Sequence, residues 1–186
     1  MRTSGVLMPI SSLPSPYGIG TMGKAARKFV DFLKKGGQKY WQILPLGPTS
    51  YGDSPYQSPA SIAGNPYFID LPTLVEEGLL EQAELDAIDW GDDPTHVAYD
   101  KIYNGRFPLL KKAMEKGWEK ELDAINAFRA ENHEWLEDYA LFMALRDFFQ
   151  KPWTQWPEDI RKRWDYSLDY YHRTMYYDVE FQKFLQ

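Results

Sequence analysis

Two short apolar runs, each interrupted by proline, constrain the fold of this chain more than any other feature. They span residues 5–10 and 40–46, and the segment after the first run, residues 11–16, holds two prolines that cannot continue a strand ladder. The second run lacks a clean alternation of apolar and polar residues, which predicts a strand buried on both faces. Two strands joined by a helix imply a parallel pair and an α/β fold.

An amphipathic helix is expected between the two runs. Its apolar residues recur at the spacing i, i+3, i+4 and i+7 on one helical face: Ala26, Phe29, Val30 and Leu33. Thr21 precedes this pattern and is expected to cap the helix, because a hydroxyl oxygen accepts hydrogen bonds from the first backbone amides. Gly36-Gly37 is expected to end it, because glycine readily adopts the left-handed conformation found there.

Charge and proline content divide the chain into two parts. Residues 1–70 carry seven basic and three acidic side chains, a net charge of +4, and eight of the thirteen prolines. Residues 71–186 carry fourteen basic and twenty-four acidic side chains, a net charge of −10. We therefore expect loops and turns in the first part and helices in the second. An acidic chain without a long basic run lacks the electrostatic footprint of a nucleic-acid-binding protein.

The composition excludes further classes. The chain has no cysteine, and therefore no disulfide framework, thiolate metal site or cysteine nucleophile. No stretch approaches the roughly 18 apolar residues of a membrane span, and the first apolar run is too short for a signal peptide. We expect a cytoplasmic protein without a membrane partner. No metal site is expected either, because the three histidines lack ligand spacing: His96, His133 and His172.

Helical periodicity dominates the second part. Residues 76–100 hold nine acidic and no basic side chains and are expected to form a connector on the surface. Three periodic runs follow, which predict helices over 102–113, 122–128 and 135–149.

Three local signals refine this helical pattern. Pro108 should kink the first helix or lie near its start, and Asn132 is expected to cap the third. The segment 153–157 should interrupt the helices, which resume at Tyr166.

The pattern predicts two domains. Residues 1–75 would form a strand–helix–strand unit with a functional loop at 47–67, and residues 76–186 an acidic connector with a helical insertion. The last periodic run reaches Gln186 without a terminator, so we expect the polypeptide to be truncated there.

One glycine motif requires that a nucleotide site be considered. Gly18-Ile19-Gly20-Thr21-Met22-Gly23 matches G-x-G-x-x-G and precedes the expected helix. However, a proline-rich loop of seven residues separates it from the first strand, and no acidic residue ends the second strand to bind a ribose hydroxyl. A nucleotide-dependent oxidoreductase is therefore a weak alternative. No acid–base pair of carboxylates can be selected from spacing alone.

The strongest functional signal is the loop after the second run. It contains Tyr51 and Tyr56, separated by small and polar residues, and loops this long are usually functional. An aromatic ring stacks on the C–H face of a pyranose, while hydroxyl, amide and carboxylate groups bind its hydroxyls. The alternative is that both tyrosines merely cover the loop and that Asp53 stabilises its turn.

The residues of this loop resemble those of the amylomaltases, the 4-alpha-glucanotransferases of plants and bacteria. The resemblance is most specific over Tyr51-Gly52-Asp53-Ser54-Pro55-Tyr56-Gln57-Ser58, and it extends over residues 5–14, 41–49, 64–71, 135–145 and 153–157. It implies a (β/α)₈ TIM barrel of the α-amylase clan. This chain would supply the N-terminal part, namely the first two strands and an inserted, mainly helical subdomain, because a whole barrel typically needs roughly 250 residues.

The resemblance also implies an activity. These enzymes transfer α-1,4-glucan segments to the 4-hydroxyl of an acceptor sugar by a retaining double displacement. Their nucleophile and acid–base carboxylates lie on later barrel strands, so no catalytic residue is assigned here and the 186-residue chain alone is expected to be inactive. The missing C-terminal part of the polypeptide would supply them. No cofactor is implied.

Four residues are assigned to substrate binding by the resemblance. Tyr56 would stack on the sugar at the cleavage position, Ser54 would line the same groove, and Tyr51 and Tyr103 would belong to a second, outlying glucan site. Three others, Gly52, Asp53 and Pro55, would shape the loop. The alternative function is a free-standing carbohydrate-binding or interaction module without catalysis.

Overall fold

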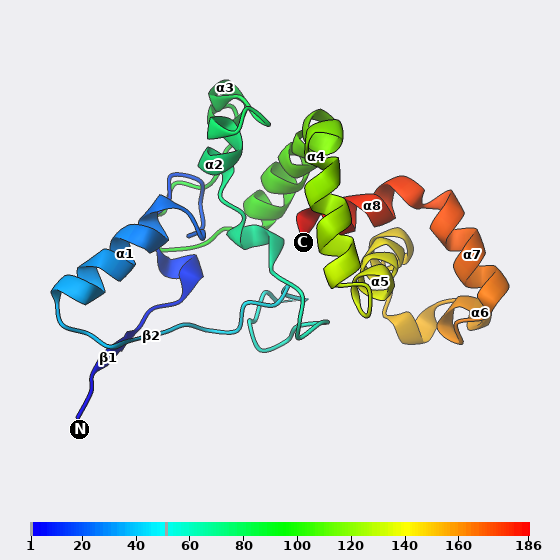
Figure 1. Ribbon diagram of the computed structural model, residues 1–186, viewed down its shortest axis with the longest axis horizontal. Helices are drawn as coiled ribbons and strands as arrows, with labels where there is room; N and C mark the ends of the chain where they lie inside the picture. Colours follow the sequence, from blue (N-terminus) through cyan, green and yellow to red (C-terminus); the bar gives the residue numbers. More distant parts are fainter. Residues whose placement is uncertain (1, 51) are drawn as a thin grey trace. The chain divides into compact units, whose positions relative to one another are not determined.

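The computed structural model describes residues 2–50 and 52–186 (Figure 1). It divides into two compact units, residues 1–116 and 117–186, and helix α4 (Tyr99–Glu131) contributes to both. The sequence-based boundary after residue 75 separates a strand–helix–strand unit from an insertion, and that division stays a prediction.

The first unit begins with two parallel strands, β1 (Gly5–Leu7) and β2 (Tyr40–Gln42). Helix α1 (Lys24–Lys35) connects them, so the predicted strand–helix–strand unit is confirmed (Figure 1). The register pairs Val6 with Trp41. Phe29 of α1 packs on Trp41 with ring centroids 5.0 Å apart, which joins the helix to the sheet.

The strands are shorter and more exposed than predicted. Each has three residues, and in each the two outer residues are exposed, so the expectation of a strand buried on both faces is wrong. Two strands cannot cover their own edges and faces, and the helix packed against them is α1. The end of the first apolar run turns instead into the 3₁₀ helix η1 (Ile10–Ser12), where Ile10 is buried.

Helix α1 ends as predicted but begins differently. Gly36 is its C-cap, Gly37 has a φ of 69°, and the Gln38 N–H donates to the Leu33 carbonyl at 3.0 Å. Its N-cap is Gly23 and not Thr21. The Thr21 hydroxyl donates to the Asp70 carboxylate instead, which is a tertiary partner that local spacing does not reveal.

The acidic connector is part of the packed structure. After η2 (Pro66–Phe68) and α2 (Leu71–Glu76), the chain forms α3 (Gln82–Asp86) and then enters α4. Most of its acidic side chains are exposed, as expected, but four apolar ones are buried: Leu79, Leu80, Leu85 and Trp90. The Trp90 indole N–H donates to the Leu85 carbonyl at 2.9 Å. The connector therefore helps to build the first unit.

Two predicted helices form a single one. The runs 102–113 and 122–128 both lie in α4, which has 33 residues and holds Pro108 in its interior. Asn132 does not cap the next helix either, because Trp135 is its N-cap. The Asn132 side chain donates to the Phe128 carbonyl at 2.9 Å and accepts from the Trp135 indole at 3.0 Å, so it stabilises the end of α4.

The second unit is helical. It contains α5 (Leu136–Phe149), η3 (Trp153–Gln155), α6 (Glu158–Arg161), α7 (Asp165–Thr174) and α8 (Tyr176–Leu185). The predicted interruption at 153–157 is confirmed. The core is one cluster of buried residues from these segments: Ala140, Leu141, Ala144, Leu145, Trp156, Ile160, Met175 and Val179. Among the residues described, no helix is long and apolar enough to cross a membrane.

Candidate functional site

The candidate site is the loop of residues 47–64, which lies between β2 and η2. Its base is closed by the Asn65 N–H, which donates to the Leu46 carbonyl at 2.9 Å. The Asn65 side chain accepts from the Tyr67 N–H at 2.9 Å and so begins η2. The two limbs of the loop approach each other at Gly47, where a Cβ would lie 2.5 Å from Ser58 Oγ. The loop is therefore closed on itself rather than extended.

Two turns in succession shape the tip. The Asp53 N–H donates to the Ser50 carbonyl at 3.0 Å, and the Gln57 N–H donates to the Ser54 carbonyl at 3.0 Å. Gly52 and Asp53 have φ values of 89° and 53°, a left-handed conformation that glycine and aspartate tolerate best. Ser54 Oγ accepts from the Tyr56 N–H at 3.4 Å. Tyr51 lies outside the described residues.

The tip points its carboxylate inward and its ring outward. Asp53 and Pro55 line a small recess of about 30 Å³ together with Thr49 and Tyr99. Burial there raises the pKa of the Asp53 carboxyl, although the Thr49 hydroxyl donates to it at 3.2 Å. The pKa of Tyr99 is also raised, by burial and by the charge of Asp53. The side chain of Tyr56, by contrast, is 73% exposed.

Tyr103 lies on a different element, α4, and is exposed. Its ring packs on Phe107 with centroids 4.9 Å apart, and Phe107 packs on Tyr67 at 6.2 Å. Tyr67 in turn contacts Tyr99 at 5.9 Å. A row of aromatic rings thus connects Tyr103 to the base of the loop. The predicted sugar-binding residues therefore come from two elements, the loop and α4.

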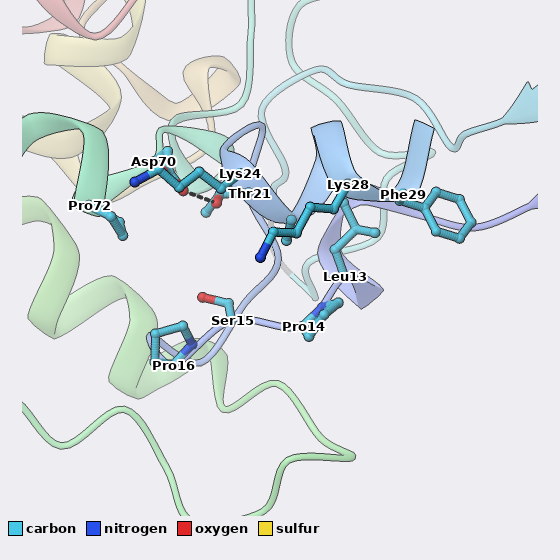
Figure 2. A pocket seen from close by; sticks show the side chains of 11 residues that line it. Leu13, Pro14, Ser15, Pro16, Thr21, Lys24, Lys28, Phe29, Asp70 and Pro72 are labelled. Atoms are coloured by element: carbon cyan, nitrogen blue, oxygen red, sulfur yellow. Dashed lines mark hydrogen bonds between the residues drawn. The ribbon is translucent and has the colours of Figure 1, made fainter. Parts of the chain in front are cut away.

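A second hollow lies beside the start of α1 (Figure 2). This cavity of about 490 Å³ is lined by the loop after β1, by α1 and by Asp70. The Lys28 side chain extends across it toward the segment that holds Ser15 (Figure 2). Asp70 is the N-cap of α2, where its Oδ2 accepts from the Thr73 N–H at 3.2 Å and from the Thr73 hydroxyl at 2.8 Å.

The Asp70 carboxylate also lies at the start of α1. A Cβ on Gly23 would lie 2.0 Å from Asp70 Oδ1, so only glycine allows this approach. In a dinucleotide site, the pyrophosphate sits at the N-terminus of the helix. Here a carboxylate of the chain itself takes that place, which argues against the nucleotide interpretation of the Gly18–Gly23 motif.

Arg106 is a buried charge whose importance sequence reasoning missed. Its guanidinium donates to the Ile69 carbonyl at 2.7 Å, while Nε and Nη1 have no partner among the described residues. Burial lowers the pKa of Arg106 to about 10, against the opposing effect of the charge of Asp70. Its position on the apolar face of the predicted 102–113 helix was the available signal.

The side chains of the 47–64 loop suit the binding of a ligand rather than acid–base chemistry. An exposed phenol ring stands on a closed loop beside hydroxyl and amide groups, whereas the loop's carboxylate faces inward. Within residues 2–50 and 52–186, no group of three or more metal-ligating side chains is placed to hold a metal ion.

Comparison with known proteins reveals a family. The family model described as 4-alpha-glucanotransferase matches residues 8–186. The 4-alpha-glucanotransferase of Streptococcus pneumoniae serotype 4 is 50% identical over 177 residues, which cover 94% of this chain and 35% of that protein. The 4-alpha-glucanotransferase of Thermus thermophilus is 45% identical over 190 residues, which cover 100% of this chain and 37% of that protein.

A solved structure agrees with these relatives. The amylomaltase from Streptococcus agalactiae in complex with acarbose superposes with a TM-score of 0.96 at 38% identity, covering 100% of this chain and 38% of the other. The predicted fold class, the N-terminal part of a larger barrel enzyme, is thereby confirmed. The chain spans little more than a third of the length of the curated relatives that it matches.

Proposed function

We propose a function from one premise: this chain belongs to the 4-alpha-glucanotransferase family. It forms one wall of the glucan site of an enzyme that transfers α-1,4-glucan segments to the 4-hydroxyl of an acceptor sugar. The observation that carries the proposal is the Tyr56 ring, exposed on a loop that two turns and a closed base hold in place.

Each residue of the loop has a role in this proposal. The Tyr56 ring stacks on the C–H face of a glucose unit at the cleavage position, and Ser54 lines the same groove. Gly52, Asp53 and Pro55 shape the tip, which the left-handed φ values of the first two support. Tyr103, with Tyr51, contributes to a second, outlying glucan site.

The chemistry is completed by residues outside this chain. A carboxylate attacks the anomeric carbon while a second carboxyl group protonates the leaving 4-oxygen, so that one glucan fragment becomes covalently attached. The 4-hydroxyl of the acceptor then displaces the carboxylate and gives its proton to the second group, with retention at the anomeric carbon. We propose that the remaining part of the polypeptide supplies both groups and that the 186-residue chain alone is inactive. The lack of cysteine fits the reducing cytoplasm.

The test uses a longer enzyme that contains this chain. It should convert maltotriose into glucose and longer maltodextrins with little net hydrolysis, and acarbose should inhibit it. Tyr56→Ala should lower kcat/KM, and the decrease should correspond to a loss of roughly 1–3 kcal/mol of transition-state binding, as when aromatic side chains are truncated at interfaces. Tyr56→Phe is the matched control, because it keeps the ring. Hydrolysis alone, or an unchanged rate for Tyr56→Ala, would contradict the proposal.

The same assay separates the alternative, a carbohydrate-binding module without catalysis. Such a module would bind maltodextrins and convert none of them, even as part of a longer polypeptide.

A further inference from the structure

Three exposed aromatic side chains form a row at the start of α7, in the second unit. Trp164, Tyr166 and Tyr170, here called the α7 row, are 43%, 63% and 59% exposed. The rings of Trp164 and Tyr166 lie 5.8 Å apart at an angle of 48°. Tyr170 follows Tyr166 by one helical turn, which places both on the same face of the helix.

The opposite face of α7 fixes this row in place. Ser167 is buried, and its hydroxyl donates to Asp159 Oδ2 at 2.9 Å. Leu168 and Tyr171 pack against the core of the second unit. The aromatic side chains therefore project from a helix that is anchored from behind, and the row is preformed rather than assembled by a ligand.

The polar tips of the α7 row are available. In the part of the chain that the structure describes, the two phenol hydroxyls and the Trp164 indole N–H make no hydrogen bond. Tyrosine and tryptophan usually find a hydrogen-bond partner when another protein covers them. A surface of large rings with free donors suits a ligand that combines an apolar face with many hydroxyls.

Three ion pairs lie beside the row. Lys162 pairs with Glu158 at 2.6 Å and Arg163 with Asp138 at 2.7 Å. On α7 itself, Arg173 lies 3.8 Å from Asp169. The row thus has a polar rim of paired charges, to which Asp165 adds a carboxylate between Trp164 and Tyr166. Such a rim suits a neutral ligand better than a phosphate or a nucleic acid.

We propose that the α7 row is a further binding surface for an α-1,4-glucan chain, on a different unit from the Tyr56 loop and from Tyr103. Successive glucose units stack on the rings, and the phenol and indole groups bind their hydroxyls. This inference rests on the proposed function for the identity of the ligand. It adds a way to hold a long glucan that the loop alone does not provide.

Native gel electrophoresis with soluble amylose in the gel tests the proposal, and it requires no turnover. The unaltered chain should migrate more slowly as the amylose concentration rises. Tyr166→Ala combined with Tyr170→Ala should weaken the apparent affinity by about tenfold or more, by analogy with the stacking of bases on aromatic side chains. Trp153→Ala is the matched control, because Trp153 is also exposed and lies outside the row. Circular dichroism checks that each variant is folded.

Several outcomes would overturn the inference. They are equal retardation of the double variant and the unaltered chain, equal retardation by dextran, and a concentration-dependent dimer that the double variant abolishes. The last would assign the row to contacts between copies of this chain.

The outcome is independent of the maltotriose test. If amylose retardation depends on Tyr56 and not on the row, the proposed function stands and this inference falls. If it depends on the row while a longer enzyme leaves maltotriose unchanged, this inference stands and the proposed function falls.

Discussion

The two units of this protein differ in their secondary structure and in the partners of their buried charges. The second, residues 117–186, is built of helices around one contiguous cluster of buried apolar residues. The first, residues 1–116, combines short strands and long loops with helices. It too buries apolar side chains, in a cluster around Ile10, Leu13 and Ala26 and at other positions: Leu71, Leu85, Ile102 and Leu110. It also has hydrogen bonds between distant segments, such as that of Thr21 with Asp70 and that of Arg106 with the Ile69 carbonyl.

The partners of the buried charges also differ between the two units. In the second unit, Lys183 contacts Glu137 at 2.6 Å and Glu180 at 2.8 Å, and Arg129 contacts both carboxylates at 3.3 and 3.2 Å. In the first unit, Arg106 has a backbone carbonyl as its hydrogen-bond partner and two donor atoms without a partner among the described residues. The difference teaches that both units bury apolar side chains, while their buried cations are held differently: by carboxylates in the second unit and by a backbone carbonyl in the first.

The largest expected effect tests the apolar core of the second unit. Leu145 is buried there, so Leu145→Ala should lower the free energy of unfolding by about 3 kcal/mol through lost transfer energy and a cavity. Hydrogen exchange followed by mass spectrometry should show faster exchange in residues 117–186 and little change around Trp90. An equal change in both regions would mean that the units unfold together, and the comparison would fail.

A smaller effect tests the polar links of the first unit. In Gly23→Ala the new Cβ would clash with the Asp70 carboxylate. The carboxylate would have to move, and its hydrogen bonds to Thr21 and Thr73 would break. We expect a loss of about 2 kcal/mol, as for hydrogen bonds to a charged group. Gly36→Ala is the control on the same helix. Its Cβ would meet the Phe32 carbonyl at an ordinary 3.4 Å, so thermal unfolding should be nearly unchanged.

Acid should reduce the stability that the ion pairs of Glu137 with Lys183 and Arg129 give to the second unit. Burial alone would raise the pKa of Glu137, but the hydrogen bond and charge of Lys183, together with Arg129, lower it below 4.5. A carboxyl group with a lowered folded-state pKa stabilises the fold above pH 4.5 and loses that contribution as the pH falls through its folded-state value. Glu137→Gln should therefore reduce stability at neutral pH, by about 1 kcal/mol or less because the site is partly exposed.

Urea unfolding at several pH values measures this effect. The difference between Glu137→Gln and the unaltered protein should shrink as the solution is acidified. A constant difference would show that Glu137 acts through packing and not through its charge.

The smallest expected effect has the opposite sign and lies in the first unit. Burial raises the pKa of Asp53 above 3.8, so the folded state binds this proton more tightly than the unfolded chain, and stability falls as the pH rises through that window. Asp53→Asn should therefore raise the free energy of unfolding slightly at neutral pH, by less than about 0.5 kcal/mol, which thermal unfolding would show as a small rise in the melting temperature. Asp53→Ala is the control and should be destabilising, because it loses the Thr49 bond and disfavours a φ of 53°.

Much of the fold could be predicted where local preferences decide it. The strand–helix–strand order and the end of α1 at Gly36-Gly37 were predicted correctly. The helices could also be predicted, but not their continuity, because the periodic runs 102–113 and 122–128 predicted two helices and α4 spans both, with Pro108 in its interior. A proline removes one backbone hydrogen bond, and the remaining turns of a 33-residue helix keep it intact.

The candidate site was predictable in position and less so in detail. The loop with Tyr56 follows from its length and its tyrosines, whereas the inward direction of Asp53 depends on Tyr99, which belongs to α4. The α7 row was not predicted, because periodicity marks Tyr166 and Tyr170 as helical without showing which face the core covers.

The sequence by itself determined which segments form helices and turns, and where the tyrosine-bearing loop lies. These properties depend on neighbouring residues, whose backbone preferences act over a few positions. Only the tertiary structure decided that Thr21 binds Asp70, 49 positions away, and that Arg106 is buried against the Ile69 carbonyl, 37 positions away. Such partners are chosen by packing, because a buried polar group must be satisfied by whichever segment the fold brings beside it.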